Sequence, residues 1–214
     1  MSRLDKSFIN AAFAAYRVWE LGNDVLYQLC REHPGHTDED AIVAKMWLIG
    51  RSYAAPIERR RQNLEMLNND FYRHLANKIS ESNFGQTLKI LSSQKNVNAS
   101  TTKSAHNSLT QILHGKTGIK NISFSSKYLH FHFPSYFYIY DSKAVSSVGR
   151  ILKDVARRRI SAQAGNADGP YAAFFDNCET LSDHVSGILG RMPRPRELDN
   201  ILMHWSDTYG RKAT

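Results

Sequence analysis

The sequence predicts an all-α protein: an irregular helical bundle forming a single domain over residues 1–214. Three observations favour this fold. Apolar side chains recur at the three- and four-residue spacing of amphipathic helices. Proline, glycine and helix-capping residues separate the periodic segments. Apolar residues make up 42% of the chain, which is enough for a substantial core.

The first third of the chain shows clear helix boundaries. Residues 6–32 are expected to form a helix, which the following Pro-Gly pair ends. Thr37 is the expected cap of the next helix, because a hydroxyl can accept a backbone N–H bond there and acids follow it in the first turn. Pro56 is expected to kink or interrupt this helix, which then continues over residues 57–67.

The rest of the chain is expected to alternate between helices and loops. Helices are predicted over residues 71–79, around 88–91, and over 104–113, 123–132, 142–160, 171–189 and 196–209. Residues 92–108 are rich in Ser, Thr, Asn and Lys and form the clearest predicted loop. Shorter turns are expected at residues 115–118 and 165–169, where glycines cluster.

Cysteine content and the start of the chain bear on location and metal binding. The two cysteines, Cys30 and Cys178, are far apart and belong to no Cys-x-x-Cys pair, so we interpret both as core residues. The chain starts with charged residues and lacks an apolar run long enough to span a membrane. We therefore expect a cytoplasmic protein with no membrane partner. No metal site and no cofactor are predicted.

The positive charge is concentrated in the middle of the chain. The whole chain has a formal charge of +8, and residues 82–163 contain 12 Lys and Arg against only Asp141 and Asp154. Residues 1–81 are electrically balanced, so we expect lobes 1–81 and 82–214 around a cleft. A concentrated positive field attracts polyanions, above all nucleic-acid phosphates. The predicted partner is therefore a nucleic acid, with DNA favoured.

Two segments around Asp141 carry a resemblance to a known family. The first is Gly118-Ile119-Lys120-Asn121-Ile122-Ser123-Phe124-Ser125-Ser126-Lys127-Tyr128-Leu129-His130-Phe131, and the second is Phe137-Tyr138-Ile139-Tyr140-Asp141-Ser142-Lys143-Ala144-Val145. Together they resemble the core of the helix-hairpin-helix DNA glycosylases, in particular the bacterial proteins of 8-oxoguanine DNA glycosylase fold. The segment Pro195-Arg196-Glu197-Leu198-Asp199-Asn200-Ile201-Leu202 is similar to the closing helix of that branch.

The resemblance implies excision of a modified or damaged base, with Asp141 as the catalytic carboxylate. Bifunctional members have a nucleophilic lysine where this chain has Ile122 or Ser123, so a monofunctional glycosylase is implied. The hairpin glycines of the family are also missing there. The expected phosphate-binding residues are Lys116, Lys120, Lys127, Lys143, Arg157 and Arg158. The expected pocket for the extruded base contains Tyr128, His132 and Tyr138.

Each of these assignments has a structural alternative. Asp141 can serve purely as a helix cap. The aromatic residues near it can be core side chains, and Arg157 and Arg158 can simply stabilise a helix C-terminus. Two alternative functions also stay open: a non-catalytic nucleic-acid-binding module, and a helical protein that binds an acidic protein partner.

Overall fold

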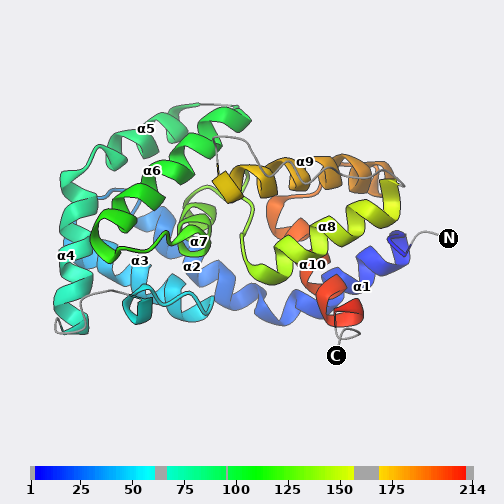
Figure 1. Cartoon of the computed structure of the whole chain (residues 1–214), viewed down its shortest axis with the longest axis horizontal. Helices are drawn as coiled ribbons and strands as arrows, with labels where there is room; N and C mark the ends of the chain where they lie inside the picture. The colour runs from blue at the N-terminus through cyan, green and yellow to red at the C-terminus, as the bar shows by residue number, and fades with distance from the viewer. Residues whose placement is uncertain (1–2, 61–66, 95, 157–168, 211–214) are drawn as a thin grey trace. The chain divides into compact units, whose positions relative to one another are not determined.

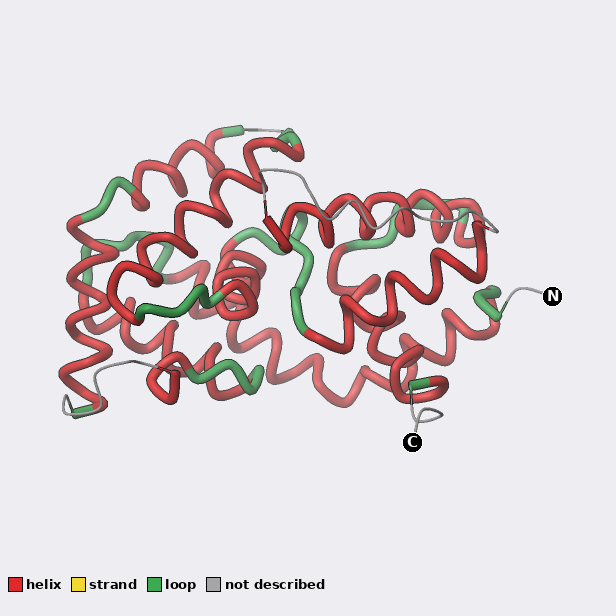
Figure 2. The backbone as a smooth tube through the Cα atoms, in the orientation of Figure 1, coloured by secondary structure: helices red, strands yellow, loops and turns green. Residues whose placement is uncertain are grey.

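The computed structural model describes residues 3–60, 67–94, 96–156 and 169–210. In these ranges the chain forms helices joined by short loops and contains no strand, which confirms the all-α prediction (Figures 1 and 2). The helices are α1 (Lys6–Tyr16), α2 (Glu20–Glu32), α3 (Glu39–Ser52), α4 (Asn68–Glu81), α5 (Phe84–Ser93), α6 (Ala99–Thr117), α7 (Ile122–His132), α8 (Ser142–Ala156), α9 (Gly169–Leu189) and α10 (Pro195–Tyr209). Two short 3₁₀ helices are η1 (Arg17–Trp19) and η2 (Ile57–Arg60).

The N-terminal helices follow their local signals with two corrections. The predicted helix over residues 6–32 is divided into α1 and α2 by the 3₁₀ turn η1. The cap of α3 is Asp38 and not Thr37, since the Asp38 carboxylate accepts hydrogen bonds from two backbone amides of the first turn. Asp38 is one residue closer to the helix, where a short carboxylate reaches those amides directly.

The predicted loop over residues 92–108 is largely helical. Only residues 94–98 separate α5 from α6, and Asn98 caps α6 by accepting a hydrogen bond from the Thr101 amide at 2.8 Å. Polar residues dominate the outer face of α6 and hide its periodicity. Its inner face is buried through Thr102, Ala105, His106, Leu109, Thr110 and Leu113. Burial of this stripe outweighs the weak helix propensity of Ser, Thr and Asn.

Two compact units make up the chain, and they do not follow the expected lobes 1–81 and 82–214. Unit 1 contains Met1–Leu21 and Tyr138–Thr214, and unit 2 contains Gly22–Phe137. In unit 1, α8 packs on α9 and α10, and α1 packs on α10. In unit 2, α3 packs on α4 and α7, and α6 packs on α7. The expected boundary followed the distribution of charge along the sequence, whereas shared cores define the units.

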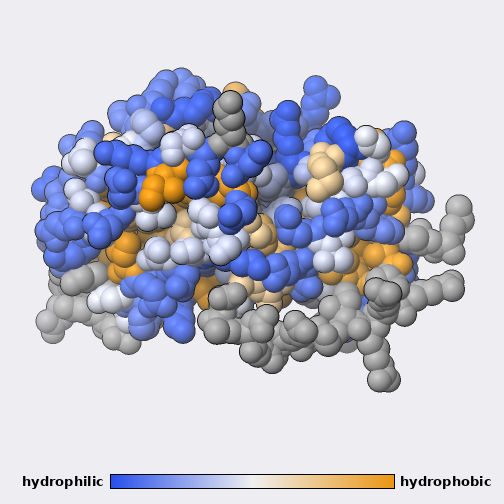
Figure 3. Space-filling view, turned by 90° about the horizontal axis from the view of Figure 1, so that it is seen from above, coloured by the Kyte–Doolittle hydropathy of each residue, from blue (hydrophilic) through white to orange (hydrophobic). Residues whose placement is uncertain are grey.

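The core of each unit is rich in aliphatic and aromatic side chains. Both cysteines are buried and free, as expected for core residues. Hydrophilic side chains predominate on the face drawn in Figure 3, with smaller hydrophobic areas between them. Among the described residues, no helix combines the length and the apolar character that crossing a membrane requires.

Candidate functional site

Asp141 lies at the start of α8 in unit 1 and caps that helix. Its Oδ1 accepts a hydrogen bond from the Ala144 amide at 2.8 Å, and its backbone carbonyl accepts from the Val145 amide at 2.9 Å. The capping prediction is therefore confirmed. The side chain is half-buried, and Oδ2 accepts no hydrogen bond from any described residue. The cap thus fixes one of the two carboxylate oxygens.

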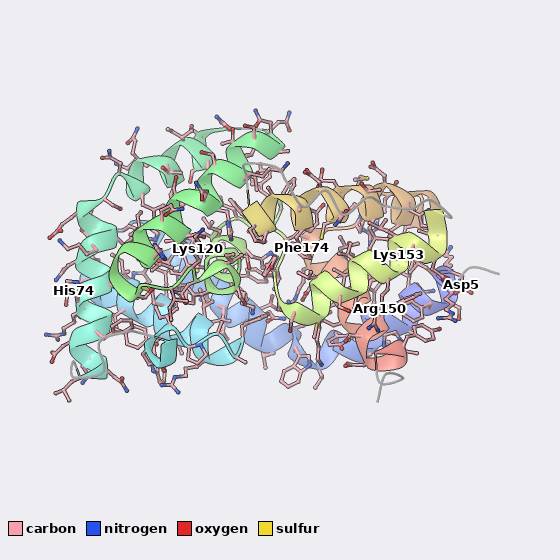
Figure 4. The ribbon with its side chains drawn as sticks, in the orientation of Figure 1. Asp5, His74, Lys120, Arg150, Lys153 and Phe174 are labelled. Carbon is pink, nitrogen blue, oxygen red and sulfur yellow. The ribbon has the colours of Figure 1, made fainter. Side chains whose placement is uncertain are left out.

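A row of cations follows Asp141 on the outer face of α8. Lys143, Arg150 and Lys153 are all exposed, and their spacing of seven and three residues places them on one side of the helix. Figure 4 shows Arg150 and Lys153 on α8. The opposite side is buried through Ala144, Ser147, Val148, Ile151 and Leu152. We call Lys143, Arg150 and Lys153 the α8 basic row.

Asp207 partly offsets the α8 basic row at its start, and the exposed Asp154 lies one turn after Arg150 on the same side of α8. Lys143 Nζ lies 3.3 Å from Asp207 Oδ1, and both side chains are about half exposed (55% and 48%). Such an exposed pair contributes little to stability. The other oxygen of Asp207 accepts a hydrogen bond from the Tyr16 hydroxyl at 2.5 Å. Burial, together with this bond, raises the pKa of Tyr16.

The remaining predicted phosphate contacts have mixed outcomes. Lys120 is exposed in the turn between α6 and α7 (Figure 4). Lys127 is only 3% exposed, and its ammonium donates to the Ser123 hydroxyl at 2.8 Å, so it is not a surface cation. Its position on the inner face of α7 explains this correction. The side chain of Lys116 lies outside the described residues, as do Arg157 and Arg158.

Two residues of the predicted base pocket are buried in the cores of their own units. Tyr138 belongs to unit 1 and is buried, with its hydroxyl donating to Glu179 Oε1 at 2.5 Å. Tyr128 and His132 belong to unit 2, where Tyr128 is fully buried. Both tyrosines are therefore core residues whose rings offer no stacking surface. Burial raises the pKa of each phenol.

Tyr128 and His132 instead form part of a buried polar cluster in unit 2. The Tyr128 hydroxyl is hydrogen-bonded to His36 Nε2 at 2.7 Å. The His36 and His132 rings lie 5.0 Å apart, centroid to centroid. Lys45 is fully buried beside them, and burial is the main cause that lowers its pKa to about 8. Lys45 is thus a basic group inside the protein. Among the described residues, it forms no ion pair with a carboxylate.

Sequence reasoning did not single out Lys45. It lies between Ile42 and Ile49 on the apolar stripe of α3, and a lysine in the middle of such a stripe is a signal of a buried amine. The neighbouring His130 is a core residue, because Nδ1 bonds the Phe137 carbonyl and Nε2 bonds the Tyr27 hydroxyl, each at 2.7 Å. In the described part of the chain, no three His, Cys, Asp or Glu side chains are arranged to hold a metal ion.

Comparison of the chain with protein-family models, with curated proteins and with solved structures gave no match.

Proposed function

We propose that the protein binds DNA through the α8 basic row and that Asp141, at the start of the same helix, is the catalytic carboxylate of a base-excision reaction. One observation supports this most directly. A half-buried carboxylate, with one oxygen fixed by the helix and the other without a donor among the described residues, is followed by three exposed cations on one side of α8.

The α8 basic row has the geometry of a phosphate contact. Helical rise places Lys143 and Arg150 roughly 10 Å apart along the axis, and Arg150 and Lys153 roughly 5 Å apart. Phosphates on one DNA strand recur at spacings of this order. Cations that neutralise phosphates release condensed counterions, so the affinity is expected to fall steeply with salt.

Charge-neutral variants test the binding step. Arg150→Gln combined with Lys153→Gln should weaken duplex binding and reduce the slope of log affinity against log salt by about two, because two phosphate contacts are lost. The matched control is Lys6→Gln combined with Arg17→Gln. It removes the same two charges from exposed positions of unit 1 outside α8.

The outcome separates DNA binding from binding to an acidic protein. Equal losses in the two double variants would show that only net charge matters and would overturn the assignment of α8. If the wild-type protein has no salt-dependent affinity for DNA, the alternative of an acidic protein partner is favoured instead.

Asp141 suits base excision for a chemical reason. Cleavage of a glycosidic bond develops positive charge on the sugar, and a fixed carboxylate stabilises that charge or orients the attacking water. Asp141→Asn is a sharp test, because asparagine caps a helix about as well as aspartate. The variant should stay folded and bind DNA, but it should no longer produce abasic sites in damaged or heavily modified DNA.

The excision test also has a clear negative outcome. If the wild-type protein leaves no abasic sites on a broad panel of damaged DNA while it binds DNA through α8, the non-catalytic module is the correct alternative. If Asp141→Asn retains full excision activity, Asp141 is only a cap.

A further inference from the structure

The buried polar cluster of unit 2 consists of Cys30, His36, Lys45, Tyr128 and His132. Four segments supply them: Cys30 lies on α2, His36 in the loop before α3, Lys45 on α3, and Tyr128 and His132 on α7. None of these groups is a carboxylic acid; the Cys30 thiol and the Tyr128 phenol are weak acids, and burial raises the pKa of each. The nearest carboxylate that affects Lys45 electrostatically is Asp38, and it is occupied in capping α3.

Lys45 has an incomplete set of partners for a buried amine. Its Nζ donates to the carbonyls of His33 at 2.6 Å and Gly35 at 3.1 Å, and no described residue accepts its third hydrogen. A buried ammonium without a counter-charge is energetically costly. A ligand that supplies negative charge would remove that cost.

Both histidines of the cluster also have a ring nitrogen without a partner. His36 Nδ1 and His132 Nε2 are buried and unbonded among the described residues. The Pro34 carbonyl lies near the His36 ring but outside hydrogen-bonding geometry with Nδ1. Buried polar atoms in folded proteins almost always have a protein, water or ligand partner. The cluster therefore has three hydrogen-bonding positions to fill.

We propose that the cluster binds a small oxyanion of the phosphate or carboxylate type, contacted by Lys45 Nζ and by the unbonded ring nitrogens of His36 and His132. The His132 residue as a whole is half-buried, although its Nε2 atom is buried. An anion fits this chemistry and a metal cation does not, because the ammonium would repel a cation. This site is in unit 2 and is independent of the α8 basic row.

Proton linkage gives the site a distinctive pH dependence. Burial is the first cause that lowers the pKa of Lys45 to about 8 and that of His36 to about 3, and it also lowers the pKa of His132. A bound oxyanion requires Lys45 to be charged. The affinity should therefore weaken about tenfold between pH 7 and pH 9, as the charged fraction of Lys45 falls. The other groups facing the amine are Cys30 and Asp38.

The experiment is an NMR titration of the full chain that follows the histidine ring signals. The probes are inorganic phosphate and acetate, against sodium chloride at matched ionic strength. His36 and His132 should shift and saturate. His106 is an internal control, because it is a buried histidine of the same unit whose Nε2 already bonds the Ile122 carbonyl at 3.1 Å.

Two further arms complete the test. Lys45→Met should abolish the saturable shifts, and the wild-type titration decides the question even if this variant does not fold. A short oligonucleotide with a 5′-phosphate, compared with its unphosphorylated form, shows whether the anion belongs to a nucleic-acid end. If neither probe nor the oligonucleotide shifts His36 and His132 beyond the chloride control, the proposal is wrong. DNA binding through α8 would be unaffected by that result.

Discussion

At the scale of single residues, the free-energy cost of burying a lysine depends on the hydrogen-bond acceptors around its ammonium group. Lys45 and Lys127 lie inside unit 2, where each ammonium has lost most of its water. Lys45 bonds two carbonyls of the loop between α2 and α3, and Lys127 bonds a serine hydroxyl one turn earlier on α7. Hydrogen bonds of this kind offset part of the cost of burying a charge.

Ala54 is a second residue on which the surrounding structure imposes an energetic cost, in this case through its backbone conformation. It has a φ of +50°, in the left-handed region that L-residues with a side chain rarely adopt. The turn after α3 imposes this conformation, since the Ala55 amide bonds the Gly50 carbonyl at 2.8 Å. Gly50 itself is closely approached, because a Cβ there would lie 3.3 Å from the Ala55 carbonyl oxygen.

We predict that Ala54→Gly stabilises the protein by roughly 0.5–1 kcal/mol, because glycine removes the steric cost but adds flexibility to the unfolded chain. Urea unfolding measures the change. The control is Ala14→Gly at an exposed position of α1, which should destabilise by about 1 kcal/mol. A loss of stability in Ala54→Gly would show that the turn does not strain residue 54.

At the scale of elements, α8 combines a capped start, a buried side and a charged side. Asp141 fixes where the helix begins, and the outer face carries the α8 basic row. The first member of the row, Lys143, is the one held by an acid, Asp207. Asp207, which lies on α10, therefore reduces the net positive charge at the start of the α8 basic row.

The proposed DNA contact through α8 predicts that Asp207→Asn tightens duplex binding a few-fold, because the substitution releases Lys143 from an opposing charge. The free energy of unfolding should change by less than about 1 kcal/mol, as expected for an exposed ion pair. Fluorescence anisotropy with labelled duplex measures the affinity. Combining Asp207→Asn with Lys143→Gln should cancel the gain, and a gain that persists would contradict the role given to Lys143.

At the scale of the whole molecule, buried histidines link stability to pH. Burial is the first cause that lowers the pKa of His36 to about 3 and that of His106 to about 4, below the ordinary value of 6.5. Both residues belong to unit 2. They take up protons on unfolding whenever the pH lies between the folded and unfolded pKa values, so acid favours the unfolded chain.

We predict that the free energy of unfolding is highest above about pH 6.5 and falls as the pH drops toward 5, by up to about 1.4 kcal/mol per pH unit for each of these two histidines. Urea unfolding at several pH values and constant ionic strength measures the slope. His106→Gln, which retains a donor for the Ile122 carbonyl, should remove one histidine's share of it. A wild-type profile that stays level over this range would contradict the prediction.

The sequence by itself determined the helices with strong local signals. Asp141 as the cap of α8, the Pro-Gly end of α2 and the long helices α9 and α10 follow from capping, backbone restriction and periodicity, which act within a few residues. The concentration of cations in residues 82–163 is equally a property of the sequence. The glycosylase resemblance and the role of Asp141 in catalysis stay predictions.

Only the tertiary structure decided which polar side chains lie inside. Lys127, Tyr128 and Tyr138 have residue types and spacings that suit a nucleic-acid surface, yet each is buried with a partner from its own unit. The helicity of α6 and the burial of Lys45 were decided in the same way. The physical reason is that burial depends on the helices packed against a residue, and neighbours distant in sequence supply that contact.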